Sequence, residues 1–234
     1  MTKLRFSSSL FRRYNELPLI LVYLVIFAAL SILSPVFLSV TNLSNIGVAV
    51  AVLGILVVAE SVVIFSGGLD LSLGAAVGIS SSILGLCLVN ASLSPWLAIL
   101  ASSLSGLAVG LLNGFIINVI GINSIITTLG TLSILRGLAL VATGGQSIVL
   151  SDPIVAFWGR GRVLSILPVP GLIMIVLFLL FHFILKYTVW GRYVYTVGGN
   201  VRAARLTGIS IKKLRFQVFA IGIPIAELSM HVEK

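Results

Sequence analysis

Six polar side chains stand out in a chain that is otherwise strongly apolar. Asp70 and Ser72 lie in the connection Ser66–Gly74, between two apolar segments. The other four carry uncharged amide or hydroxyl groups and lie in two later apolar segments: Asn113, Asn118, Thr127 and Thr128. Such groups both donate and accept hydrogen bonds, which suits a hydroxylated solute better than an ion. They also bridge neighbouring membrane helices, which is the commoner use of any single one. The six are candidates for a solute pathway.

Two acids, Asp70 and Glu60, each allow more than one interpretation. The pair Gly67-Gly68 permits backbone angles that other residues avoid, and Asp70 then lies where its carboxylate can accept an N–H from the first turn of the next helix. The alternative is that Asp70 or Ser72 faces a polar cavity and contacts a hydroxylated substrate. For Glu60 we consider a protonated carboxyl, an ion pair with Arg136, or a role in transport.

A second candidate site is a basic segment late in the chain. Asn200 is typical of a residue that caps a helix, and Gly208 of one that ends it, so a short helix is predicted between them. A loop that binds lipid headgroups is one interpretation. The capped ends and the mixed Ala, Arg and Leu face favour docking to a protein. The docking candidates are Gly198, Gly199, Asn200, Ala203, Ala204, Arg205, Leu206 and Gly208.

The composition indicates the environment in which these residues lie. The chain is 59% hydrophobic and 9% charged, whereas soluble domains carry about 25% charged residues. Eleven of the fifteen Lys and Arg residues fall in two clusters, Lys3–Arg13 and Lys186–Arg215, and no charged residue or histidine lies between Leu71 and Leu135. Basic residues remain on the cytoplasmic side of membrane proteins, so both clusters are predicted to face the cytoplasm. This rule explains the net charge of +9 without nucleic-acid binding.

The apolar segments predict an all-α, polytopic transmembrane helix bundle, since a span needs about 20 apolar residues. Six complete spans are predicted: Leu17–Leu33, Ile46–Phe65, Leu71–Val89, Leu97–Ile120, Ile125–Val141 and Leu167–Leu185. The predicted organisation is a cytoplasmic basic N-terminus (1–16), the six-span bundle (17–185), a cytoplasmic loop (186–213), and an incomplete seventh span with a divergent tail (214–234). A short external helix is expected between Gln146 and Pro170.

Glycine spacing predicts how the spans pack. Gly106, Gly110 and Gly114 recur every fourth residue, as do Gly74 and Gly78. Stripes of this kind let helix backbones approach closely in a membrane.

Catalytic and metal-binding patterns are missing from the sequence. Cys87 is the only cysteine, and His182 and His231 lie far apart. No Gly-x-x-x-x-Gly-Lys-[Ser/Thr] loop occurs, so any ATP would be bound by a partner subunit. We therefore expect no enzyme, no metal site and no cofactor in this chain.

Four motifs in order resemble the ribose-type, monosaccharide permease subunit of bacterial ABC importers. They are Gly67–Gly74, Gly110–Gly114, Thr127–Gly137 and Gly198–Ile209, within a resemblance that covers roughly residues 15–220. The resemblance implies a helical permease in the bacterial inner membrane that forms homodimers or heterodimers. A cytosolic ABC ATPase would drive it through a coupling helix in Gly198–Ile209. A periplasmic or lipid-anchored binding protein would deliver a ribose-like sugar or related small polyol.

The sequence also departs from this pattern. After Ile221 the resemblance stops where the family continues with further spans, which predicts truncation or a frameshift. Asn123-Ser124 replaces a proline pair that is usual in the family. The alternatives are an ion-coupled secondary carrier that uses Glu60 and Asp70, and an inactive truncated remnant. Branched-chain amino acids are the nearest alternative substrates.

Overall fold

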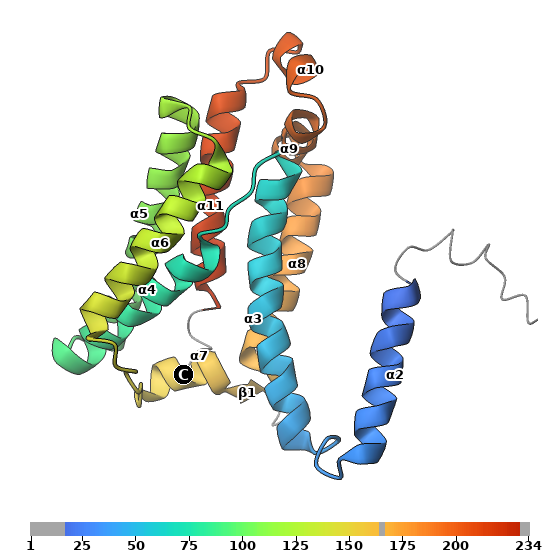
Figure 1. Ribbon diagram of the computed structural model, residues 1–234, viewed down its shortest axis with the longest axis vertical. Coiled ribbons are helices and arrows are strands. Elements are labelled where there is room, and N and C mark those ends of the chain that lie inside the picture. Colours follow the sequence, from blue (N-terminus) through green and yellow to red (C-terminus); the bar gives the residue numbers. More distant parts are fainter. Residues whose placement is uncertain (1–16, 164–166, 230–234) are drawn as a thin grey trace, which may run out of the picture. The chain divides into compact units, whose positions relative to one another are not determined.

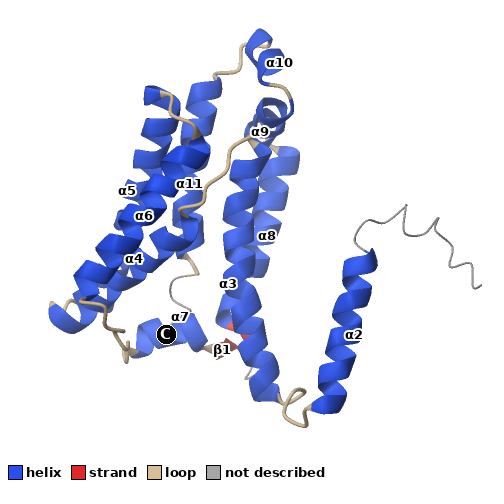
Figure 2. Cartoon of the chain, viewed as in Figure 1, coloured by secondary structure: helices blue, strands red, loops and turns tan. Residues whose placement is uncertain are grey.

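The computed structural model describes residues 17–163 and 167–229 and consists almost entirely of helices (Figures 1 and 2). The N-terminal cluster Lys3, Arg5, Arg12 and Arg13, and His231, lie outside the described residues. The elements up to the middle of the chain are α2 (Leu17–Leu33), α3 (Val40–Phe65), α4 (Leu73–Gly85), the π-helical turn η1 (Leu86–Asn90), α5 (Pro95–Phe115), the π-helical turn η2 (Ile116–Ile120) and α6 (Ser124–Thr143). They are followed by α7 (Pro153–Arg160), β1 (Arg162–Val163), β2 (Leu167–Pro168), α8 (Val169–Tyr187), α9 (Val189–Gly199), α10 (Val201–Leu206) and α11 (Ile211–Glu227).

The all-α prediction is confirmed, and each predicted span forms a helix. Within residues 17–163 and 167–229, five helices are long and apolar enough to cross a membrane: α3, α4 with η1, α5 with η2, α6 and α8. The sixth, α2, is a shorter apolar helix of 17 residues within the described chain. Several boundaries differ from the prediction, and two of them have a local cause. Helix α3 begins at Val40, where the Ser39 hydroxyl accepts the Asn42 N–H at 3.3 Å. Helix α8 begins at Val169, because Leu167 and Pro168 pair with β1.

Local sequence accounts for where the helices start. The predicted short helix between Gln146 and Pro170 is α7, and the Asp152 carboxylate caps it by accepting the N–H groups of Ile154 and Val155. Asn123 caps α6 through a 2.9 Å bond from the Ile125 N–H. The asparagine thus initiates α6, since this residue type is favoured at a helix N-terminus.

The chain divides into two compact units, residues 1–46 and 47–234. In the described part of the first unit, α2 ends in a turn in which the Phe27 and Phe37 rings meet edge to face, 5.3 Å apart. The side chain of Asn42 donates to the Phe37 carbonyl at 2.8 Å and closes this turn onto the start of α3.

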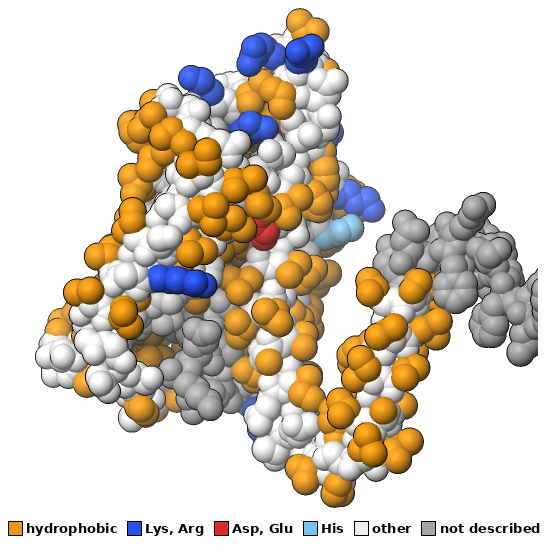
Figure 3. All heavy atoms as spheres, viewed as in Figure 1, with side chains coloured by type: hydrophobic (Ala, Val, Ile, Leu, Met, Phe, Trp, Pro, Cys, Tyr) orange, Lys and Arg blue, Asp and Glu red, His pale blue; other side chains and the backbone are white. Residues whose placement is uncertain are grey.

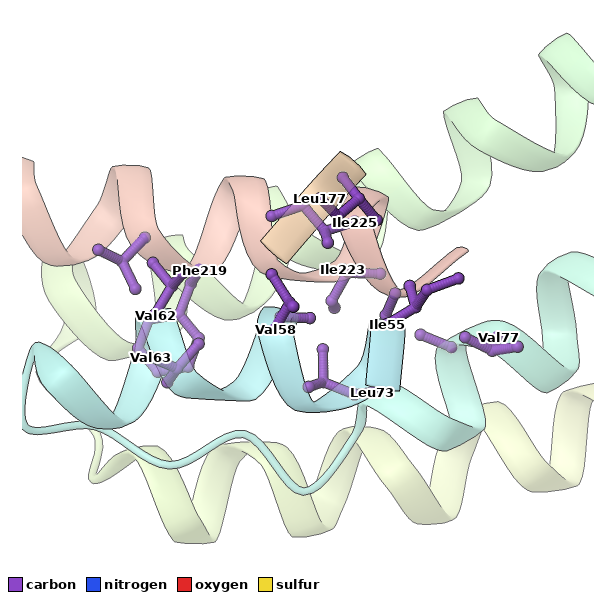
Figure 4. Packing of buried hydrophobic residues seen from close by; sticks show 14 of the residues in the cluster. Ile55, Val58, Val62, Val63, Leu73, Val77, Leu177, Phe219, Ile223 and Ile225 are labelled. Atoms are coloured by element: carbon purple, nitrogen blue, oxygen red, sulfur yellow. The ribbon is translucent and has the colours of Figure 1, made fainter. Parts of the chain in front are cut away.

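The core of the second unit is formed by α3, α4, α8 and α11 (Figure 4). Ile55 and Val62 of α3 are fully buried, and Phe219 and Ile223 of α11 pack against them. Apolar side chains also cover much of the outer surface in Figure 3, on helices that are long enough to span a bilayer. An apolar exterior around a small buried core is what a lipid solvent favours.

One of the two glycine stripes forms the contact between α5 and α11. A Cβ added at Gly110 would lie 2.9 Å from the Phe219 carbonyl oxygen, and one at Gly114 would lie 3.2 Å from Phe216. Gly106 packs directly against the Glu227 carboxylate. The predicted close approach is therefore confirmed for α5. The stripe on α4 differs, because a Cβ at Gly74 or Gly78 would meet no atom within 4 Å.

We expect Gly110→Ala to destabilise the bundle by about 1–3 kcal/mol, because the added methyl group forces α5 and α11 apart. Gly130→Ala on α6 is the matched control, since a Cβ at Gly130 meets nothing within 4 Å. It should leave stability unchanged or raise it slightly, because alanine is the better helix former. Thermal unfolding in detergent measures both. Equal unfolding temperatures for the two variants would contradict the close α5–α11 contact.

Candidate functional site

A continuous chain of hydrogen bonds crosses the centre of the second unit. The Asp70 N–H donates to Glu60 Oε1 at 3.2 Å, and the Ser72 hydroxyl donates to Asp70 Oδ1 at 2.6 Å. Asn113 Nδ2 donates to Ser72 Oγ at 2.9 Å. The Thr131 hydroxyl donates to Asn113 Oδ1 at 2.7 Å. These five residues, which we call the polar network, join α3, the α3–α4 connection, α5 and α6.

The network is buried and tightly constrained. Ser72 and Asn113 are fully buried, and Asp70 is 4% exposed. Asp70 Oδ1 also accepts the Ser72 N–H at 2.9 Å. Helix α4 begins at Leu73, so this N–H belongs to the residue just before the helix. The prediction that Asp70 caps the first turn of α4 is therefore wrong in detail: the carboxylate closes a turn ahead of α4, and this turn directs Ser72 toward α5.

The other three predicted pathway residues form bonds within single helices. The side chains of Asn118, Thr127 and Thr128 each donate to a carbonyl four residues earlier, at 2.9, 3.0 and 2.8 Å. Asn118 also lines a cavity of about 250 Å³ beside Arg215. The structure thus brings Asp70, Ser72 and Asn113 together and does not join the other three to them.

Thr131 is a member of the network that the sequence analysis missed. It lies four residues after Thr127 and so on the same face of α6, a spacing that could have indicated it. Ser133, two residues further along, has an exposed side chain that donates to the Leu129 carbonyl of its own helix.

The acids of the bundle retain unused acceptor oxygens. Glu60 Oε2, Asp70 Oδ2 and Glu227 Oε2 are buried without a hydrogen-bond partner in the described chain. Glu227 accepts a bond from Ser80, and Ser80 is 2.9 Å from Ser105, which links α4, α5 and α11. Glu60 bonds to the Asp70 N–H, and Arg136 lines a cavity on α6. Free acceptors beside uncharged donors form a polar interior suited to hydroxyl groups.

The predicted basic segment forms two capped helices. Thr188 Oγ1 accepts the Gly191 N–H at the start of α9. Asn200 Oδ1 accepts the N–H groups of Arg202 and Ala203, both at 3.0 Å, and so initiates α10. Gly208 has a φ of +80° and leads the chain out of α10. The short, capped helix predicted here is therefore confirmed.

Helix α10 presents an apolar tip in a basic setting. Ala204 is buried, while Ala203, Arg205 and Leu206 are exposed, and Leu206 is 89% exposed. Figure 1 shows α9 and α10 at one end of the second unit and α7 at the other. Lys and Arg side chains gather at the α10 end in Figure 3. An exposed leucine flanked by arginines is a suitable contact for a protein partner.

Backbone contacts connect this end to the polar network. Gly198 of α9 packs directly against the Phe65 carbonyl, and an added Cβ would overlap that group. The Arg215 side chain of α11 donates from Nε to the Ser66 carbonyl at 3.2 Å. Both contacts hold the turn Ser66–Gly68, where Gly67 has a φ of +78°. This turn leads directly to Asp70, so α9 and α11 both contact the segment that precedes the network.

Apolar helices long enough to span a bilayer, packed around a buried polar network, define a polytopic membrane protein. The profile of the family described as "Branched-chain amino acid transport system / permease component" matches residues 42–229. The chain belongs to this family, whose members are permease components of transporters rather than enzymes. The match extends past Ile221, where the sequence analysis had expected it to stop.

Sugar permeases are among the similar proteins. The L-arabinose ABC transporter permease protein AraH of Azospirillum brasilense is 35% identical over 88% of this chain and 60% of its own length. The ribose import permease protein RbsC of Haemophilus influenzae is 36% identical over 85% of this chain and 62% of its own length. RbsC of Escherichia coli K12 is 31% identical over 92% and 67%. The chain thus spans about three fifths to two thirds of these relatives. No solved structure matches it.

Thr131→Val should destabilise the bundle by about 1–3 kcal/mol, because it leaves Asn113 Oδ1 buried without a donor. Ser133→Ala, which removes an exposed hydroxyl two residues away, should change stability by less than about 0.5 kcal/mol. Thermal unfolding in detergent measures both variants. A double-mutant cycle of Thr131→Val with Asn113→Leu isolates the pair, and strictly additive effects would contradict a shared bond.

Proposed function

We propose that this chain is the membrane-spanning subunit of an ATP-driven importer of a monosaccharide, a ribose- or arabinose-like sugar or a related small polyol. The observation that carries this proposal is 31–36% identity to ribose and arabinose permeases along most of the chain. The uncharged donors and acceptors of the polar network support a hydroxylated solute. Family membership alone also accommodates a branched-chain amino acid.

The proposal implies the other components of the transporter. A separate ABC ATPase binds ATP in the cytoplasm and docks on α10, and a periplasmic or lipid-anchored protein delivers the sugar. The permease lies in the bacterial inner membrane as a homodimer or heterodimer, with its N-terminus and the α9–α10 end in the cytoplasm. The position of Lys and Arg at the α10 end supports this orientation, because basic residues remain on the cytoplasmic side.

Transport then proceeds by alternating access. ATP binding displaces α10, and α9 transfers the displacement to the Ser66–Gly68 turn through the contact between Gly198 and the Phe65 carbonyl. The turn carries Asp70 and Ser72, whose bonds to Asn113 connect it with α5. Breaking and remaking this set of bonds changes which side of the bundle is open to polar groups.

Uptake by cells that lack their own ribose and arabinose permeases tests this function. The chain is expressed with its cognate ATPase and binding protein, and labelled ribose, arabinose and leucine are supplied in turn. We expect sugar uptake that stops when the ATPase is inactivated. Leucine uptake alone would indicate the amino acid alternative. Uptake that persists without ATP and follows an imposed ion gradient would indicate a secondary carrier that uses Glu60 and Asp70.

Arg205→Glu should abolish co-purification of the ATPase with the permease, because it reverses a charge on the exposed face of α10. Lys213→Glu makes the same charge change at an exposed position at the start of α11, and it should leave co-purification intact. Pull-down from detergent with equal amounts of membrane-inserted permease measures both. Equal retention of the ATPase by the two variants would exclude α10 as the docking helix.

Gly198→Ala should uncouple docking from transport, because its methyl group displaces α9 from the Phe65 carbonyl. A misplacement that costs about 1–3 kcal/mol lowers the uptake rate by about tenfold or more. Gly199→Ala is the adjacent control, since its Cβ meets nothing within 4 Å. The two variants are compared by sugar uptake at matched ATPase co-purification. Normal uptake by Gly198→Ala would show that transport does not require this contact.

A further inference from the structure

An open cavity of about 450 Å³ lies between α4, α6 and the segment that follows α6. Its polar lining includes Ser81 and Ser82 of α4, Arg136 and Thr143 of α6, and Gln146. We call it the α4–α6 cavity. Its volume lies within the range of small-molecule sites, about 300–1,000 Å³. It borders the end of α6 that leads toward α7, and Figure 1 shows α7 at the end of the unit opposite α9 and α10.

Arg136 is the charged member of the described residues that line this cavity. It lies seven residues before the end of the membrane-spanning helix α6, and its side chain is exposed. An arginine at such a depth is strongly disfavoured against lipid, so residues of this kind face a polar cavity and mark a solute pathway. Glu60, the acid that the sequence had suggested as its partner, instead bonds to the Asp70 N–H. The guanidinium is therefore available to a ligand.

The lining offers both donors and acceptors. Ser81 Oγ is buried without a hydrogen-bond partner. The hydroxyls of Ser82 and Thr143 donate to the carbonyls of Gly78 and Ala139, so each retains lone pairs that can accept a bond. The Gln146 amide provides both functions. A carboxylate or phosphate would use the guanidinium donors and meet surplus acceptors, whereas a molecule with several hydroxyl groups matches both kinds.

Glycines keep the cavity open. Gly74 and Gly78 form its wall on α4, and no atom lies within 4 Å of a Cβ added at either position. At the end of α6, Gly144 and Gly145 have φ values of +61° and +73°, which turn the chain back and bring Gln146 over the cavity. Ile148 then packs against Gly85, where an added Cβ would lie 3.0 Å from its side chain. The space is thus bounded by a fixed turn and is not filled by the chain's own side chains.

We infer that the α4–α6 cavity binds the transported solute, a small polyhydroxylated molecule, with Arg136 as its principal donor. The inference rests on the proposed importer function and adds to it the place where the sugar is held at the bundle end opposite the docking helix. It also explains why one glycine stripe is packed by α11 while the other faces open space.

Protection from chemical labelling tests this site directly in the full-length permease. Ser82→Cys is introduced in a Cys87→Ser background and labelled with a membrane-impermeant maleimide. At a concentration of ribose or arabinose about ten times its Kd, the labelling rate should fall about tenfold, because the sugar occupies most of the sites. Leucine at the same concentration should give no protection. Arg136→Gln should reduce the protection by sugar at this concentration to about twofold or less, since hydrogen bonds to a charged group contribute about ten- to hundredfold in affinity.

A steric variant provides a second measurement. Gly78 lines the cavity and a Cβ added there meets nothing within 4 Å, so the side chain of Gly78→Leu should project into the cavity and abolish sugar uptake. The unfolding temperature and ATPase co-purification should stay unchanged. Gly130→Leu adds the same side chain at an open position on α6, outside the cavity lining, and should leave uptake within about twofold of wild type.

The outcomes separate this inference from the proposed function. Wild-type uptake of neither sugar refutes the importer proposal, and the site with it. Wild-type sugar uptake without sugar protection of Ser82→Cys, or with normal uptake by Gly78→Leu, refutes the site alone. Protection by leucine in place of sugar also refutes the polyhydroxylated ligand.

Discussion

The arrangement of this bundle depends on one constraint: a polar group within apolar helices has to find its partner inside the protein. Without water, an unpaired donor or acceptor costs several kcal/mol. Ser72, Asn113 and Thr131 meet this constraint by bonding in sequence across the α3–α4 connection, α5 and α6. Each bond fixes the rotation of a helix about its axis, because a rotated helix would bury its polar group against hydrocarbon. The network thereby orients the surfaces that line the cavities.

Much of this architecture could be predicted from the sequence, because its signals are local. Apolar length gave the spans, and Asn200 and Gly208 predicted the ends of α10. The stripe Gly106–Gly114 predicted a close helix contact but not its partner, since nothing in α5 specifies that α11 fills it. The sequence does not indicate which distant segments pair with one another. Thr131 and Asn113 lie in different helices, and each is as polar as Ser133, so only the folded arrangement distinguishes the network members.

The difference between local signals and long-range pairing also explains how well each candidate site was predicted. The short capped helix α10 was predicted well because its caps, charges and exposed leucine lie within a few consecutive residues. The six candidates for a solute pathway separate in the structure: three belong to the polar network, and three bond within their own helices. Hydroxyl and amide groups in membrane helices serve both purposes. Arg136 became a candidate for solute binding only when its surroundings were known, because the sequence offered Glu60 as an equally reasonable partner.

The contact between α9 and the end of α3 has a mechanical consequence. Gly198 meets the Phe65 carbonyl with no side chain between the two backbones, and Gly67 lies beside it. A helix contact made through side chains yields under small displacements, since rotamer changes take up the movement before the backbone shifts. A contact between two backbones has no side chain to rearrange. A displacement of α9 by less than an ångström would therefore move the end of α3 by nearly the same amount. In the proposed mechanism, the absence of a side chain at Gly198 therefore makes this contact a stiff link between α9 and α3.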